Sequence, residues 1–262
     1  DIFPVHSASG RFLAYAYFNP QNSLAARVLT FEQEDPIEAV RKKMREALEM
    51  RKALSIPSNA YRLINAEADS LPGLIVDVYQ NVAVIQINTW GMEKLRNVVI
   101  EELVSLLNPL ALFEKSISLA RKQEGLPDKK GWILGSPIAD IKIQERGIEY
   151  HVSIETGQKT GFFLDQREMR NYLFLNALHK KVLNCFSYTG GFSLAALKGG
   201  AVSVDSVDIS KEACQYCLQN SKEYANHRIF QEDVFTFLQT QELDYNIVIL
   251  DPPAFVKRRK DL

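Results

Sequence analysis

The chain has 262 residues, a formal net charge of −1 and a hydrophobic content of 46%. These values are ordinary for a globular protein with one large domain or two modest ones, and they give no overall basic signal for nucleic acid, although local patches can still bind it. No apolar run approaches the ~20 residues that a membrane span needs, and no signal-peptide pattern opens the sequence. The three cysteines are few for this length, which favours a reducing, cytoplasmic setting.

The N-terminal region is predicted as short strands followed by one helix. Residues 11–20 form an aromatic-rich strand that stops at Asn19-Pro20, and residues 24–30 form another. Residues 36–54 carry apolar side chains at helical spacing, with Pro36 in the first turn. The opposite face of this helix is rich in lysine and arginine, which indicates either a solvated face or a patch that contacts RNA.

The middle of the chain has the pattern of an α+β unit. Apolar runs separated by turn residues predict strands, and one longer amphipathic run predicts a helix. The alternation around Arg146-Gly147 predicts a β-hairpin. The predicted strands span 61–67, 73–79, 82–88 and 111–116, the helix spans 92–107, and the hairpin spans 140–154.

From about residue 165 helices and strands alternate. A helix over 165–178 is expected to begin with a capping box of Asp165 and Glu168, and Ser210 is expected to cap a later helix. Such alternation favours a parallel, doubly wound sheet. Its predicted strands span 181–185, 202–209, 227–233 and 245–250.

A polar side chain follows each of these four strands. Asn184 opens the turn that ends at Gly190, and Asp208, Asp233 and Asp251 stand at the ends of the next three strands. In an open parallel sheet, ligands bind beyond the carboxyl ends of the strands. An acid or an amide at four successive strand ends therefore indicates a ligand site rather than packing alone.

The first turn departs from the acid-x-G-x-G-x-G pattern that is usual in methyltransferases. Asn184 stands in place of the acid, Phe186 and Tyr188 replace two glycines, and Gly190 is retained. Two aromatic side chains would crowd a pyrophosphate, so a cofactor without phosphate suits this turn better than a dinucleotide. Asp208 fits an acid that accepts hydrogen bonds from ribose hydroxyls, with Asp205 as its competitor.

The last of these strand ends is unusual because an acid is followed by two prolines. Asp251-Pro252-Pro253 can continue neither a strand ladder nor a normal helix, so it predicts a rigid turn. Such a turn can present backbone carbonyls and the Phe255 ring to a flat substrate. In nucleic-acid methyltransferases a base docks at this place.

These motifs, in this order, resemble the PUA-domain rRNA methyltransferases of the class I S-adenosylmethionine fold. The likeness extends to residues 63–79, which are typical of the middle domain of that family, so it runs through most of the chain. One branch of the family methylates C5 of a cytosine in large-subunit rRNA, and a sister branch makes N2-methylguanine. The motifs are "GQKTGFFLDQREMR" (157–170), "VLNCFSYTGGFSLAAL" (182–197), "SVDIS" (206–210), "EDVF" (232–235) and "LDPPAF" (250–255).

The resemblance implies S-adenosylmethionine as the cofactor and gives the residues roles. Asp208 would bind the ribose hydroxyls, Asp233 would accept from the adenine amine, and Arg167 could neutralise the cofactor carboxylate. The base would dock over Asp251, Pro252, Pro253 and Phe255, with no metal. The full set of implied cofactor residues is Gln158, Phe163, Asp165, Arg167, Asn184, Ser187, Tyr188, Gly190, Asp208 and Asp233.

The implied fold class is α/β, with three parts. Residues 1–35 would be the end of a PUA-like RNA-binding β-barrel, 36–156 an α+β middle domain, and 157–262 a Rossmann-like methyltransferase domain that stops after its fourth strand. The chain begins without Met and ends just after a buried strand, so we expect it to belong to a longer protein. RNA is the expected partner, with no membrane, and a homodimer is one assembly that the sequence allows.

Cytosine-5 methylation also needs a thiolate that adds to C6 of a base taken out of its stack. The resemblance places that cysteine beyond residue 262. Cys185, at the end of a strand, is expected to pack in the core, and Cys214 and Cys217 to pack along a helix without a metal. The alternatives are N2-methylguanine formation, a non-catalytic RNA-binding module of the same fold, and a Rossmann-like oxidoreductase, which would need the two missing glycines.

Overall fold

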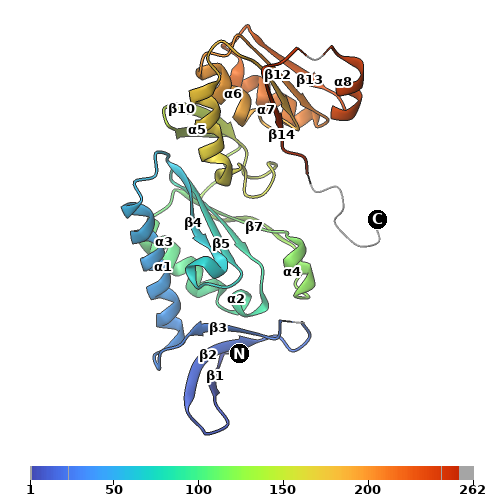
Figure 1. The fold of residues 1–262 in the computed structure, drawn as a ribbon. Helices are drawn as coiled ribbons and strands as arrows, with labels where there is room; N and C mark the ends of the chain where they lie inside the picture. The colour runs from blue at the N-terminus through green and yellow to red at the C-terminus, as the bar shows by residue number, and fades with distance from the viewer. Residues whose placement is uncertain (1, 23, 243, 254–262) are drawn as a thin grey trace. The chain divides into compact units, whose positions relative to one another are not determined.

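The computed structural model describes residues 2–22, 24–242 and 244–253, and divides into two compact units. The first unit holds residues 1–141 with 153–162, and the second holds 142–152 with 163–262. Figure 1 shows the elements of both along the chain. Each unit is described by itself.

The first unit contains two sheets (Figure 1). Over the described residues, β1 (Ile2–His6), β2 (Phe12–Phe18) and β3 (Ala26–Thr30) form an antiparallel sheet of three strands. A five-stranded sheet has the order β4-β5-β6-β7-β8, in which β6 and β7 are parallel and the other neighbours antiparallel. Its strands are β4 (Ala60–Asn65), β5 (Leu74–Tyr79), β6 (Val82–Ile87), β7 (Ala111–Ser116) and β8 (Lys129–Leu134).

Helices of the first unit pack apolar stripes into one core with this sheet. The helix α1 (Pro36–Ala53) begins where the Asp35 carboxylate accepts from the backbone N–H groups of Ile37 and Glu38. Its buried residues join those of α3 (Arg96–Leu107) and of β4–β7 in a single cluster. The short elements are η1 (Ala66–Asp69), α2 (Trp90–Lys94) and α4 (Leu119–Gln123).

The second unit is built on a parallel sheet. Its described strands have the order β13-β12-β11-β14, and every neighbouring pair is parallel. Cores lie on both faces of this sheet, which confirms the predicted doubly wound arrangement. The elements are η2 (Leu164–Gln166), α5 (Arg167–Asn176), β11 (Lys181–Cys185), α6 (Gly191–Lys198), β12 (Ser203–Asp208), α7 (Lys211–Ser221), β13 (His227–Gln231), α8 (Val234–Thr240) and β14 (Ile247–Leu250), preceded by the predicted hairpin of β9 (Ile141–Glu145) and β10 (Ile148–Val152).

Two local predictions were wrong. The single helix expected over 92–107 is two helices, because Thr89 caps α2 by accepting from the Met92 N–H and the chain breaks at Leu95. The expected capping box is absent, since α5 begins at Arg167 after a 3₁₀ turn and its N-cap residue, Gln166, makes no capping hydrogen bond. Ser210 does cap α7, by accepting from the Ala213 N–H.

Candidate cofactor site

The four predicted strand ends meet at one edge of the parallel sheet. The chain runs from β11 to β12 and β13 on one side, and then returns so that β14 pairs with the other side of β11. The sheet order therefore reverses between β11 and β14, and the turn after β11 opens at this switch point. Such a point is where open α/β sheets bind their ligands.

The turn after β11 keeps the backbone of a glycine-rich loop although it has lost two glycines. Phe186, Tyr188 and Gly190 have φ angles of +55°, +49° and +79°. All three lie in the left-handed region, which favours glycine, so the two aromatic residues are strained there. We call residues 184–190 the cofactor loop.

Gly190 is required by both its conformation and its surroundings. A Cβ atom at this position would lie 2.5 Å from the Sγ atom of Cys217 on α7. Its N–H donates to the carbonyl of Ser187, and its own carbonyl accepts from the N–H of Leu194 in α6. The glycine thus lets α6 start directly under the loop and close to α7.

Asp208 organises the loop from the neighbouring strand. Its Oδ2 atom accepts from the N–H of Tyr188 at 2.8 Å, and its Oδ1 atom accepts from the N–H of Ser210 at 2.9 Å. The competing acid, Asp205, points elsewhere: it is 1% exposed, pairs with Arg228 and accepts from the Tyr245 hydroxyl. Asp208 is therefore the carboxylate at the strand end, as the sequence indicated.

Ser187 carries a buried hydroxyl with no partner among the described residues. The residue is 5% exposed, and its Oγ atom has no hydrogen-bond partner. A buried polar atom without a partner is unfavourable unless a ligand supplies one. The orphaned hydroxyl, the glycine-like backbone and the carboxylate of Asp208 fit a cofactor with a ribose and no phosphate.

Other predicted cofactor residues differ in their relation to the loop. The Phe163 ring meets the Tyr188 ring edge-on at a centroid distance of 5.3 Å. Arg167 is half-buried and donates to Glu168, while Asp165 is exposed in the 3₁₀ turn before it. Gln158 belongs to the first unit, and its role at this loop stays a prediction.

Asp233 and Asp251 stand after β13 and β14. The Oδ1 atom of Asp233 caps α8 by accepting from the Thr236 N–H, a structural role that the sequence analysis missed although an acid before a helix is its usual signal. Asp251 accepts from Gln166 at 3.4 Å and borders a largely apolar cleft of about 380 Å³ along α5 and β14. Pro252 and Pro253 follow it and are exposed, whereas the predicted docking residue Phe255 lies outside the described residues.

The cysteines are buried, as predicted. Burial raises the pKa of the Cys185 thiol to about 11 and that of Cys217 to about 12. The pKa of Cys214 is also raised, by burial and by the negative charge of Asp208. A nucleophilic cysteine needs a lowered pKa and access to its substrate, and these three have neither.

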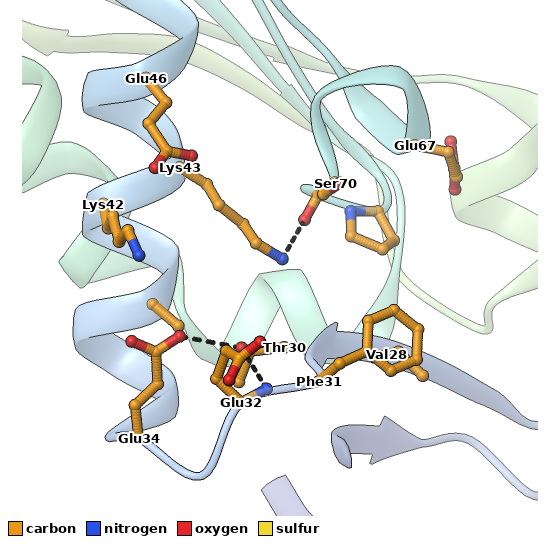
Figure 2. A pocket seen from close by; sticks show the side chains of 12 residues that line it. Val28, Thr30, Phe31, Glu32, Glu34, Lys42, Lys43, Glu46, Glu67 and Ser70 are labelled. Atoms are coloured by element: carbon orange, nitrogen blue, oxygen red, sulfur yellow. Dashed lines mark hydrogen bonds between the residues drawn. The ribbon is translucent and has the colours of Figure 1, made fainter. Parts of the chain in front are cut away.

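A second cavity, of about 390 Å³, lies in the first unit between β3, α1 and η1 (Figure 2). Glutamates and lysines both line it, and Lys43 donates there to the carbonyls of Leu29 and Ser70. Nearby on α1, Arg41 and Arg45 pair with Glu38 and with glutamates of α3. These arginines tie two helices together, which supports the structural interpretation of the basic helix face. Among the described residues, no cluster of side chains suits a metal ion and no helix is long and apolar enough to cross a membrane.

Comparisons with known proteins show the family to which the chain belongs. A family model described as S-adenosylmethionine-dependent methyltransferase matches residues 76–260, and a PUA-like domain model matches residues 1–31. The chain is 37% identical to the ribosomal RNA large subunit methyltransferase I of Alteromonas mediterranea and 35% identical to that of Aeromonas salmonicida. Each match covers the whole chain and 69% of the relative.

Solved structures show the same likeness. A methyltransferase candidate in complex with SAH, S-adenosylhomocysteine, is 30% identical and superposes with a TM-score of 0.85 over 99% of this chain and 69% of that one. A SAM-dependent methyltransferase candidate from Streptococcus mutans is 29% identical, with a TM-score of 0.83 over 97% of this chain and 68% of that one. The chain belongs to the S-adenosylmethionine-dependent methyltransferase family that includes the ribosomal RNA large subunit methyltransferases I, and S-adenosylmethionine is its cofactor.

Proposed function

We propose that this enzyme methylates RNA of the large ribosomal subunit, with C5 of a cytosine as the target. The observation that carries the proposal is the cofactor loop next to Asp208 in a chain whose full length matches ribosomal RNA large subunit methyltransferases I. When bound, S-adenosylmethionine supplies an electrophilic methyl group. In this proposal Asp208 binds the ribose, the loop holds the methionine end, Asp233 accepts from the adenine amine and Arg167 faces the cofactor carboxylate.

The strand end at Asp251-Pro252-Pro253 is proposed to receive the target base. The carboxylate of Asp251 is exposed and its near neighbour is the neutral amide of Gln166, so it can accept from an amino group. The two prolines fix the backbone beside it. A base must leave its stack to reach such a pocket. We expect Phe255 to complete it.

The cysteines bear on the choice of chemistry. Because Cys185, Cys214 and Cys217 are buried with raised pKa values, the thiolate that cytosine-5 methylation needs would come from a residue outside 1–262. N2-methylguanine formation is the second candidate, because methylation of an exocyclic amine needs no thiolate. A non-catalytic RNA-binding module is the third.

Analysis of the product separates these candidates. The full-length enzyme, which includes the sequence beyond residues 1–262, is incubated with S-adenosylmethionine and unmodified large-subunit rRNA, and the nucleosides are identified by mass spectrometry. We expect 5-methylcytidine, and we expect the same yield from Cys185→Ser. Formation of N2-methylguanosine would establish the second candidate, and RNA binding without any methylated nucleoside would establish the third.

RNA contact by α1 stays a prediction and needs a variant that spares the helix–helix pairs. Lys42 is exposed, whereas Arg41 and Arg45 already have acidic partners. If the helix contacts phosphates, Lys42→Glu should lower the salt dependence of rRNA binding by about one unit of slope. An unchanged slope would leave this face to solvent. The proposal also includes a cytoplasmic setting. The oligomeric state is a separate question, and light scattering of the same samples would distinguish a monomer from a homodimer.

A further inference from the structure

A continuous chain of hydrogen bonds runs beneath the cofactor loop, from β11 to the start of β13. The Nδ2 atom of Asn184 lies 2.9 Å from Ser193 Oγ, which lies 2.6 Å from Ser206 Oγ. Ser206 Oγ is 2.7 Å from His227 Nε2, and His227 Nδ1 is 2.6 Å from Ser221 Oγ. The chain ends where Ser221 meets the carbonyl oxygen of Cys217, at 2.7 Å. Apart from the half-buried histidine, its side chains are almost completely buried.

The far end of this chain determines the tautomer of the histidine. A carbonyl oxygen can only accept, so Ser221 must use its single hydroxyl hydrogen toward Cys217. Ser221 Oγ can then only accept from His227 Nδ1, which must carry a hydrogen. Burial lowers the pKa of His227 to about 4, against a smaller opposing effect of Asp205, so the ring is neutral at physiological pH. In a neutral ring with hydrogen on Nδ1, Nε2 is an acceptor.

The same reasoning determines the donor and acceptor roles of the other groups, from His227 back to Asn184. Ser206 must donate to His227 Nε2, so its Oγ atom accepts from Ser193. Ser193 has then used its own hydrogen and can only accept from Asn184, which must present its NH₂ group. The orientation of an amide side chain follows from such a network. Asn184 Oδ1 is therefore left as the acceptor on the side away from Ser193.

This orientation matters because Asn184 replaces an acid in the loop pattern. A carboxylate offers an acceptor in either orientation, whereas an amide offers an acceptor in one orientation and a donor in the other. The methionine end of the cofactor carries an ammonium group, which needs an acceptor. An asparagine can take the place of the acid only if its amide is held with Oδ1 outward.

We propose that His227 is a positioning residue for the cofactor loop: through Ser206 and Ser193 it holds the Asn184 amide with Nδ2 inward and Oδ1 available to the cofactor. The inference rests on the proposed role of the loop in binding the methionine end. The sequence gives little sign of it, because His227 is 43 positions after Asn184 and shares no motif with it.

The donor-to-acceptor direction of this chain of hydrogen bonds can be measured without a ligand. In the ¹⁵N-histidine-labelled protein, which has four histidines, the His227 signals are assigned as those that disappear in His227→Gln. We expect a neutral ring with its hydrogen on Nδ1, and we expect Ser221→Ala to release this preference. A ring with its hydrogen on Nε2 would reverse the chain, turn Asn184 Oδ1 toward Ser193 and overturn the proposal.

Calorimetry with S-adenosylhomocysteine then tests the consequence. His227→Leu should weaken binding about 15-fold, the effect of one lost hydrogen bond to a charged group. Thr240→Ala is the matched control, because Thr240 donates to the carbonyl of Thr236 on α8 as Ser221 does to Cys217, but contacts no histidine. It should bind as the unmodified protein does.

The decisive variant is Asn184→Asp. A carboxylate needs no orienting, so His227→Leu should have less than a twofold effect in that background. An equal loss in both backgrounds would show that His227 only supports the fold, and would overturn the proposal. Failure of the unmodified protein to bind S-adenosylhomocysteine would instead contradict the proposed loop function, and the tautomer measurement would still decide the direction of the chain.

Discussion

Buried polar groups differ in their hydrogen-bond partners between the five-stranded sheet and the strand ends of the parallel sheet. In the five-stranded sheet they are matched by side chains of the same unit: Asp77 accepts from Arg62 and from Thr160, and Glu114 accepts from Arg96 and from Ser116. At the strand ends of the parallel sheet, Asp208 is held by backbone N–H groups and Ser187 Oγ has no partner among the described residues. Closed networks of the first kind hold a fold together, whereas incompletely satisfied groups at a sheet edge are suited to a ligand.

The largest effect is expected from opening a closed network. Asp77→Ala removes the buried carboxylate that accepts from the guanidinium of Arg62 and the hydroxyl of Thr160, and should lower the free energy of unfolding by about 3 kcal/mol. Urea denaturation measures this, with Asp128→Ala as control, because the exposed Asp128–Lys122 pair should contribute less than about 1 kcal/mol. If Asp77→Ala instead weakened cofactor binding in the folded protein, the distinction between the two sheets would fail.

Asp208→Ala, unlike Asp77→Ala, should affect cofactor binding more than stability. It removes the proposed ribose contacts and releases the N–H of Tyr188, so S-adenosylhomocysteine should bind about 30-fold more weakly, or about 2 kcal/mol. Asp205→Asn on the same strand should lower stability and change the dissociation constant less than threefold, because Asp205 is committed to Arg228 and Tyr245. Calorimetry on both variants would reverse our choice of acid if Asp205→Asn proved the more damaging to binding.

His227 gives the parallel sheet a pH dependence. Its folded pKa, about 4, is below the ordinary value of 6.5 because of burial, so the unfolded chain binds a proton first as pH falls. Its contribution to stability is complete above pH 6.5 and is lost between about 6.5 and 4. Between pH 7 and pH 5.5 we expect a loss of about 1 kcal/mol in urea denaturation. His227→Gln should remove most of that slope and His179→Gln, at an exposed position, should not.

Ser187→Ala is expected to have the smallest effect on stability and affinity, and it tests the difference between the two sheets most directly. Because its hydroxyl has no partner, Ser187→Ala should leave the free energy of unfolding unchanged or raise it by up to about 1 kcal/mol, while weakening S-adenosylhomocysteine about threefold. Ser116→Ala is the contrast, since that hydroxyl donates to Glu114 and accepts from the Ile87 N–H. The Ser116→Ala protein should be less stable than the unmodified protein and should bind S-adenosylhomocysteine with unchanged affinity. A Ser187→Ala protein that is clearly destabilised would mean that the hydroxyl has a structural partner.

The sequence predicted the fold class and the meeting of the strand ends because both follow from local patterns. Alternation of helices and strands fixed the parallel sheet, and Asp208 could be preferred over Asp205 because it closes an apolar run. The region 117–139 received no elements from the sequence, although it holds α4 and β8. Lys129-Lys130-Gly131 at the start of β8 dilutes its strand pattern, and the strand exists because β7 pairs with it.

The details of the site depended on contacts that a sequence does not display. The loss of two glycines at Phe186 and Tyr188 predicted a changed loop, yet both residues keep positive φ angles. Tyr188 is held there by the Asp208 carboxylate and packs against Phe163, and neither contact is local in sequence. The same holds for Asn184, which bonds to Ser193 and through it is linked to Ser206 and His227, and these three residues come from separate elements.

The strand order also determines when β11 gains its second neighbouring strand during synthesis. β11 is the first strand of its sheet along the chain but lies inside it, and the N–H of Lys181 bonds the side chain of Asn246, 65 positions later. Chains leave the ribosome from the N-terminus, so β11 is exposed on one side until β14 emerges. The backbone N–H and C=O groups along that edge of β11 stay without their strand partner for that interval. The cofactor loop thus follows a strand whose second edge stays unpaired until residues 247–250 have been made, and an unpaired strand edge is a site at which a nascent chain can misassemble.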